Sequence, residues 1–299
     1  PYMLSFYIGP AVLYLFLYDV LVVFLVVGMD WEWIASPHVP LGLYGAAVGV
    51  IVSVRNNSAY ARWWEGRILW GAIVNNCRGL ARQVLTTLEP VVPDSAAERA
   101  EIAAVQREFI YVIIAYVIAL RQGLRQVEPW EDLGAVLTPD EIAPLKGVNN
   151  VALALNNRMG ELAQRCQARK WITPMVWMAM DQNIDDLVDS QGGAERIKNT
   201  PLPRQYVFFP RLFVQIYCLM LPLGMVENLG WLTPLGSTLV GFMFLTLDKI
   251  GRELEDPFDN QLHDVPMTSI TRTIEINLRQ MLNEATIPAP VQPVDNVLW

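Results

Sequence analysis

Residue types that commonly serve in enzyme active sites are scarce in this sequence. Its 299 residues include two histidines and three cysteines. His38 and His263 are predicted on opposite sides of a membrane, as argued below, so neither a catalytic triad nor a histidine metal cluster is expected within one chain. The G-x-S-x-G, phosphate-loop and H-E-x-x-H motifs are also missing. We therefore do not expect an enzyme.

The cysteines indicate neither a disulfide framework nor a zinc site. Cys77, Cys166 and Cys218 lie far apart, and Cys218 is within an apolar run. Zinc ligands and small disulfide-rich domains need closely and regularly spaced cysteines. We expect three buried free thiols.

Charge is also scarce, and the net charge is acidic. Charged residues make up 17% of the chain, whereas soluble domains carry about 25%. The net charge of −8 argues against a nucleic-acid partner, because binding to phosphates needs a basic face. Hydrophobic residues reach 53% and gather in long runs, so we expect the chain to reside in a lipid bilayer.

Four apolar runs approach the roughly 20 residues that a helix needs to cross a bilayer. They are Pro10–Gly28, Leu41–Val54, Val207–Met225 and Trp231–Leu247. A fifth run, Phe109–Leu120, is only about 12 residues long, which is typical of a buried helix in a soluble domain.

The distribution of basic residues favours four spans. All 22 lysines and arginines lie within Arg55–Arg211 or Lys249–Arg279, and basic segments tend to stay in the cytoplasm. If Phe109–Leu120 crossed the bilayer, two basic segments would lie on opposite sides. We expect a multi-pass protein of the cell (inner) membrane, with both termini in the cytoplasm.

This topology predicts four parts along the chain. Residues 1–54 hold two spans, 55–206 form a helical cytoplasmic domain, 207–247 hold two more spans, and 248–299 form a cytoplasmic C-terminal segment. Apolar residues at spacings of three and four predict cytoplasmic helices over 96–126, 148–166 and 171–188. Gly192-Gly193 is expected to end the last of them, and three prolines predict an extended tail over 287–299.

The second span has a face of small residues. Gly42, Ala46, Val50 and Val54 follow one another at a spacing of four, so they share one side of a helix. Several copies around an axis would place rings of alanine or valine on a lumen, and apolar constrictions of this kind gate by dewetting. The alternative is an ordinary packing helix, since small residues let helices approach closely in lipid.

Three aspartates, Asp181, Asp185 and Asp189, are four residues apart and share a helix face. Because like charges at this spacing repel, the face must be solvated or paired between subunits. If several copies lined a vestibule, their negative field would attract cations.

A second acidic group surrounds Pro257-Phe258. It consists of Glu253, Glu255, Asp256, Asp259 and Asp264. Carboxylate oxygens are the ligands that Ca²⁺ prefers, so Glu255, Asp256, Asp259 and Asp264 are candidate calcium ligands. The alternative is a capped, solvated turn.

Two charged residues lie inside predicted spans. Asp19 is in the middle of the first span, where it should face protein or be protonated, and the sequence does not name its partner. Arg211 is about four residues into the third span, so it can snorkel to the cytoplasmic interface or pair with another subunit.

Five stretches resemble the bestrophin family, in particular its bacterial members. They are SVRNNSAYARWWEGRILW (53–70), GAERIKNTPLPRQY (193–206), LPLGMVENLGWLTP (221–234), LDKIGRELEDPFDNQLHDVP (247–266) and TRTIEINL (271–278). They occur in order over most of the chain. The four-span topology agrees with that family independently of these stretches.

The resemblance implies an all-α membrane protein that assembles as a homopentameric ion channel around one central pore. The family's pore neck falls at Ala46, Val50 and Val54 of this sequence. Other members carry bulkier isoleucine or phenylalanine there, so this neck is expected to be wider or less strongly dewetted. The family's cytoplasmic aperture falls at Leu202, between Pro201 and Pro203.

The resemblance bears less clearly on calcium. Animal members use the acidic loop after the Pro-Phe pair as a calcium clasp, but Asn260, Gln261 and His263 dilute the acidic run here. We expect that no cofactor is required.

The permeant ion stays open between two signals. Arg55 lies just below the neck and would favour anions if it faced the lumen, whereas the acidic balance of the chain favours cations. The family has members of both kinds, and we expect small monovalent ions, with cations such as sodium slightly preferred over chloride. The rival hypotheses are a secondary transporter, although the chain has no internal repeat and no discontinuous span, and a non-conducting membrane scaffold.

Overall fold

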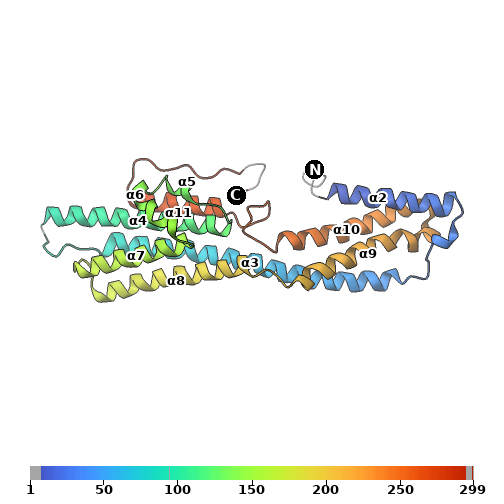
Figure 1. Cartoon of the computed structure of the whole chain (residues 1–299), viewed down its shortest axis with the longest axis horizontal. Coiled ribbons are helices and arrows are strands. Elements are labelled where there is room, and N and C mark those ends of the chain that lie inside the picture. The colour runs from blue at the N-terminus through green and yellow to red at the C-terminus, as the bar shows by residue number, and fades with distance from the viewer. Residues whose placement is uncertain (1–7, 94, 294–297, 299) are drawn as a thin grey trace. The chain divides into compact units, whose positions relative to one another are not determined.

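The computed structural model describes residues 8–93, 95–293 and 298 (Figure 1). Helices make up 77% of the structure, and the described residues form no strand. The all-α class predicted from the periodicity is therefore confirmed. The chain divides into two compact units, one of residues 1–63 and 201–256 and the other of 64–200 and 257–299. Helix α3, Leu41–Thr87, contributes residues to both.

The first unit contains the predicted spans. It is built from α2 (Gly9–Val23), the π-helical turn η1 (Phe24–Gly28), the short helix η2 (Glu32–Ile34), the first part of α3, α9 (Arg204–Leu229), η4 (Gly230–Leu232) and α10 (Thr233–Glu253). Its core joins α2, α3 and α9 through Leu15, Val48, Val52, Val214, Tyr217, Cys218 and Leu221. All these core residues come from the predicted spans.

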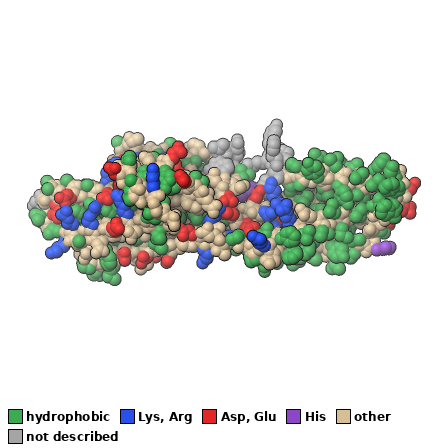
Figure 2. Space-filling view, viewed as in Figure 1, with side chains coloured by type: hydrophobic (Ala, Val, Ile, Leu, Met, Phe, Trp, Pro, Cys, Tyr) green, Lys and Arg blue, Asp and Glu red, His purple; other side chains and the backbone are tan. Residues whose placement is uncertain are grey.

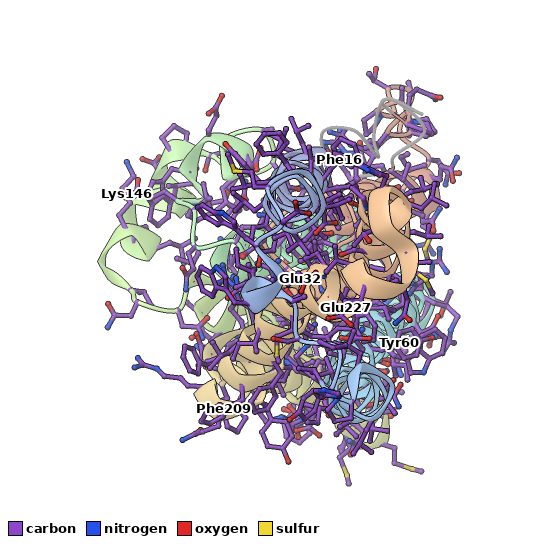
Figure 3. All side chains as sticks on the ribbon, turned by 90° about the vertical axis from the view of Figure 1, so that its right-hand side faces the viewer. Phe16, Glu32, Tyr60, Lys146, Phe209 and Glu227 are labelled. Atoms are coloured by element: carbon purple, nitrogen blue, oxygen red, sulfur yellow. The ribbon has the colours of Figure 1, made fainter. Side chains whose placement is uncertain are left out.

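The outer surface of the first unit is apolar. Hydrophobic side chains cover the surface over α2, α9 and α10 (Figure 2), and Tyr14, Leu235 and Leu239 are exposed by 73%, 71% and 62%. Seen end on, Phe16 and Phe209 point outward from this unit (Figure 3). Soluble monomeric proteins rarely expose so large an apolar area to water. This surface therefore suits contact with lipid or with further copies of the chain.

Helix α10 approaches its neighbours through glycines. A Cβ on Gly241 would lie 2.2 Å from Leu15 Cδ2 on α2, and one on Gly251 would lie 1.9 Å from Asn56 Oδ1 on α3. A larger residue at either position would require the Leu15 or Asn56 side chain to move. This is how small residues pack helices within lipid, and it keeps α2 and α3 close to α10.

By length and composition, three helical segments among the described residues could cross a membrane: Gly9–Gly28, Ala96–Leu124 and Arg204–Glu253. The last contains both α9 and α10. The apolar start of α3 is not among them, because its apolar run ends at Arg55. In the most apolar window of Ala96–Leu124, 67% of the residues are buried inside the protein, against 28% for Gly9–Gly28. The apolar character of that helix therefore belongs to a protein core.

That helix, α4 (Ala96–Leu124), is the centre of the second unit. It packs against α7 (Val151–Ala168), α8 (Pro174–Asn199) and α11 (Met267–Met281). Residues 109–120 of α4 are all buried except the half-buried Tyr111. The shorter elements α5 (Trp130–Leu133), α6 (Pro139–Ile142) and η3 (Ala143–Gly147) complete the unit.

The predicted end of the last cytoplasmic helix is wrong. Helix α8 continues through Gly192-Gly193 to Asn199. A Cβ on Gly193 would lie 2.9 Å from Leu69 Cδ2 on α3, so the glycine permits a close contact between the two helices. The packing gained there outweighs the low helix propensity of glycine, which costs about 1 kcal/mol.

In the predicted extended tail, residues 287–293 form no regular element, and 294–297 and 299 lie outside the described residues.

The three cysteines are free and buried, as the sequence predicts. Burial raises the pKa of the Cys77 thiol to about 12 and that of Cys166 to about 11. Because the thiolate is the reactive form, we expect no alkylation of the folded protein by N-ethylmaleimide at neutral pH and three adducts after denaturation, counted by intact-mass spectrometry. An adduct on the folded protein would contradict this packing.

Candidate functional site

The residues predicted to form the pore neck are on the exposed side of α3. Val50 and Val54 are exposed by 64% and 51%, and Ala46 is exposed as well. Val48 and Val52 are on the opposite side, at 8% and 1% exposure, and pack in the core of the first unit. The protomer thus presents the spacing-four face outward, as required of a helix that lines a pore or packs on another copy.

Arg55 does not share the exposure of Val54. It is 2% exposed, and its Nη1 lies 2.7 Å from Asp248 Oδ1 on α10. Its Nη2 donates hydrogen bonds to the Asp248 carbonyl oxygen at 2.6 Å and to Asn56 Oδ1 at 3.0 Å. The condition on which Arg55 would favour anions, that it faces a lumen, is not met in this chain, since the guanidinium is turned into the first unit and pairs with Asp248 there.

Sequence reasoning missed Asp248 as the partner of Arg55. The two residues are 193 positions apart, and no local pattern connects them. The available signal was that Asp248 directly follows an apolar span, where a carboxylate is costly unless a cation neutralises it.

Leu202 lies in the loop between α8 and α9 and is half-buried. Its backbone N–H donates a hydrogen bond to the Glu255 carboxylate, and burial raises the pKa of that carboxyl. Arg62 Nε on α3 donates to the Glu255 carbonyl oxygen at 3.0 Å. Glu255 therefore anchors the proline-flanked loop, which is a structural role that the sequence did not reveal.

A basic residue follows this loop. Arg204, two residues after Leu202, begins α9 and is exposed, and Arg211 further along the same helix is also exposed. The exposure of Arg211 fits the predicted snorkelling to an interface. If several copies of the chain assembled with their Leu202 side chains in a ring, the Arg204 side chains would lie close to that ring.

The three aspartates of the second unit share the outward face of α8. Asp185 and Asp189 are exposed and Asp181 is half-buried, whereas Ile184 and Leu187 on the other face are buried. The predicted common face is therefore present in the protomer. Its use as a vestibule wall depends on an assembly and stays a prediction.

The carboxylates proposed as calcium ligands have other partners. Asp259 pairs with Lys198, Asp264 accepts a hydrogen bond from the Gln261 backbone N–H at 2.9 Å, and Glu255 accepts one from Leu202. Among the described residues, no group of three or more His, Cys, Asp or Glu side chains could hold a metal ion. The four candidate carboxylates around Pro257-Phe258, Asp256 included, therefore do not form a metal-binding group among these residues.

The membrane-type core of the first unit contains a buried polar cluster. Asp19 is 0% exposed, and Thr238 Oγ1 on α10 donates to its Oδ2 at 2.8 Å. This names the partner that the sequence left open. Asp19 faces protein, as predicted, and the nearby start of α10 carries a Thr233 hydroxyl that is buried without a hydrogen-bond partner among the described residues.

Comparison with known proteins places the chain among membrane proteins. A family model described as "Bacterial/Fungal Bestrophin protein" matches residues 5–280. The chain is 33% identical to "Voltage-dependent anion channel-forming protein YneE" of Escherichia coli O157:H7, over 96% of this chain and 90% of that protein. A Mesorhizobium japonicum protein, also described as voltage-dependent anion channel-forming, is 33% identical over 82% of this chain and 75% of its own length.

Solved structures agree with these relatives. A bacterial bestrophin homolog from Klebsiella pneumoniae is 26% identical and matches with a TM-score of 0.82, over 92% of this chain and 99% of that one. A second crystal structure, described as that of a membrane protein carrying one substitution, gives a TM-score of 0.83 at 26% identity, over 93% of this chain and all of that one. The sequence resemblance is therefore confirmed, and the chain belongs to the bestrophin family.

Proposed function

We propose that this chain forms a homopentameric channel for small monovalent ions in the inner membrane. Each protomer crosses four times, through α2, the start of α3, α9 and α10, and keeps both termini in the cytoplasm. The observation that carries the proposal is the outward apolar face of Ala46, Val50 and Val54 on α3, in a chain of the bestrophin family.

The neck acts through the absence of polar groups. Side chains of alanine and valine offer no hydrogen bond to a passing ion or its water, so a narrow ring of them empties of water and blocks flow. Since Ala46 and both valines are smaller than the phenylalanine or isoleucine expected from the family, the barrier is lower. Leu202 forms the second constriction, held in place by Glu255.

We propose that the permeant ions are anions. The named relatives are described as anion channel-forming, and the exposed Arg204 beside Leu202 would surround the aperture with positive charge, as arginine rings do in anion pores. Arg55 takes no part, because Asp248 neutralises it. The acidic net charge of the chain favoured a slight preference for cations. We replace that expectation, because charges more than a Debye length of about 8 Å from the constriction are largely screened. The local charge at the constriction then decides which ion passes.

The first test is the sign of the permeant ion. Purified protein in a planar bilayer under a tenfold KCl gradient should give unitary current steps with a reversal potential near the chloride limit. A potential near the potassium limit would overturn anion selectivity and restore the cation hypothesis. If the bilayer shows no current but liposomes containing the protein take up ions in a saturable way, the channel hypothesis is wrong and the transporter hypothesis is favoured.

Neck substitutions should change the unitary current in opposite directions. A change of about 1 kcal/mol in the dewetting barrier alters a rate roughly fivefold, so Val50→Ala and Val54→Ala should raise the conductance or open probability by about that factor, and Val54→Phe should lower it. Leu239→Ala, at an exposed apolar position on α10, is the matched control and should leave the current unchanged. Equal currents in all four variants would place the neck elsewhere.

The assembly can be measured without any current. Native mass spectrometry of the protein in detergent should give a complex of five chains, each of 33.7 kDa. Any other number of chains would contradict the pentamer, whatever the bilayer recordings show.

A further inference from the structure

Val54 and Arg55 are adjacent on α3 but face opposite environments. Val54 is 51% exposed and Arg55 is 2% exposed. Because successive residues on an α-helix point about 100° apart, whatever holds Arg55 inward also determines which way Val54 points. The direction of the proposed neck is thus linked to the partners of Arg55.

The partners of Arg55 outside α3 come from one short stretch of α10. Arg55 Nη1 contacts the Asp248 carboxylate at 2.7 Å, and Nη2 donates to the Asp248 carbonyl oxygen at 2.6 Å. Asn56 Nδ2 donates to the Leu247 carbonyl oxygen at 2.9 Å. Two consecutive residues of α3 therefore bond two consecutive residues of α10, which fixes both the rotation and the axial position of α3.

Two further contacts surround the pair, and neither of them joins α3 to α10 through Asp248. Arg252 Nε on α10 lies 3.2 Å from Asp248 Oδ2, so both carboxylate oxygens of Asp248 are engaged. Asn56 Oδ1 accepts hydrogen bonds from Arg55 Nε and Nη2 and occupies the space that a Cβ on Gly251 would need. The surrounding core of α3 and α9 consists of apolar contacts among Val48, Val52, Val214 and Tyr217, and such contacts are non-directional.

We propose that Asp248 is a positioning residue for the pore, which holds α3 through Arg55 so that Ala46, Val50 and Val54 face the lumen. The inference rests on the proposed function, since it assigns that face to a lumen. An ion pair through Nη1, joined by a second hydrogen bond from Nη2 to the Asp248 carbonyl oxygen, sets orientation more sharply than apolar contacts do, and a buried polar pair is best attested as such a specifier of register. Removal of the pair releases the rotation of α3.

The test reads the orientation of α3 directly, by cysteine labelling in the full-length assembly. The native cysteines are buried, so single reporters are introduced as Val54→Cys on the exposed side and Val52→Cys, at 1% exposure, on the buried side. A charged methanethiosulfonate reagent should modify the first reporter and spare the second. Unitary conductance is recorded on each variant without a reporter.

Asp248→Asn should raise the labelling rate of the Val52→Cys reporter about tenfold, because the buried side of the helix becomes transiently accessible, and should change the unitary conductance. Arg252→Gln is the matched control: it removes the other cation bonded to the same carboxylate, from α10 itself, and should change neither. Asp248→Glu keeps the charge, so it should bring the labelling rate of the Val52→Cys reporter and the unitary conductance back towards their wild-type values.

Unchanged labelling and conductance in Asp248→Asn would overturn the proposal and leave the pair a purely structural contact. If Asp248→Asn does not assemble, Arg55→Lys tests the same point, because a lysine keeps the charge but loses the second hydrogen bond. Unaltered labelling there also overturns the proposal. Since labelling needs no current, a silent wild-type bilayer would refute the proposed function while the orientation of α3 is still measured.

Discussion

The buried contact between Arg55 on α3 and Asp248 on α10 is the constraint on which the first unit depends. An ion pair at 2% and 5% side-chain exposure loses most of its hydration, and the removal of one partner from such a pair costs about 3–5 kcal/mol. That is a large share of the roughly 5–15 kcal/mol by which a typical domain is stable. Replacing either residue therefore threatens the helix packing as well as the local charge balance.

Helix α10 also approaches α2 and α3 closely through glycines. Gly251 leaves room for Asn56 and Arg55, and Gly241 leaves room for Leu15. Helices that gain little from hydrophobic contact inside lipid rely on such close packing and on hydrogen bonds between helices. The Thr238–Asp19 bond is a second example, and it lies on the same helix. Helix α10 is thus the element that holds both α2 and α3.

The second unit buries a very apolar helix inside protein. Helix α4 is long and apolar enough to cross a membrane, yet Phe109, Ile113 and Val117 are 0% exposed because α7, α8 and α11 surround it. The positive-inside rule assigned this segment to the cytoplasm from the basic residues on both sides of it. Hydropathy alone gives the opposite assignment, whereas the burial of 67% of the most apolar window of this helix agrees with a helix packed inside protein.

Periodicity and charge were sufficient to predict the helical class, the apolar runs of α2, α9 and α10, the common face of Ala46, Val50 and Val54 on α3 and the buried cysteines, because each depends on residues close together in sequence. The partner of Arg55, the anchoring of Leu202 by Glu255 and the passage of α8 through Gly192-Gly193 were decided only by the tertiary structure. Each depends on an atom brought in from a distant part of the chain: Asp248 is 193 residues from Arg55, and Leu69 is the residue against which Gly193 packs. A sequence specifies which side chains need such a partner, but only the folded chain determines which atom provides it.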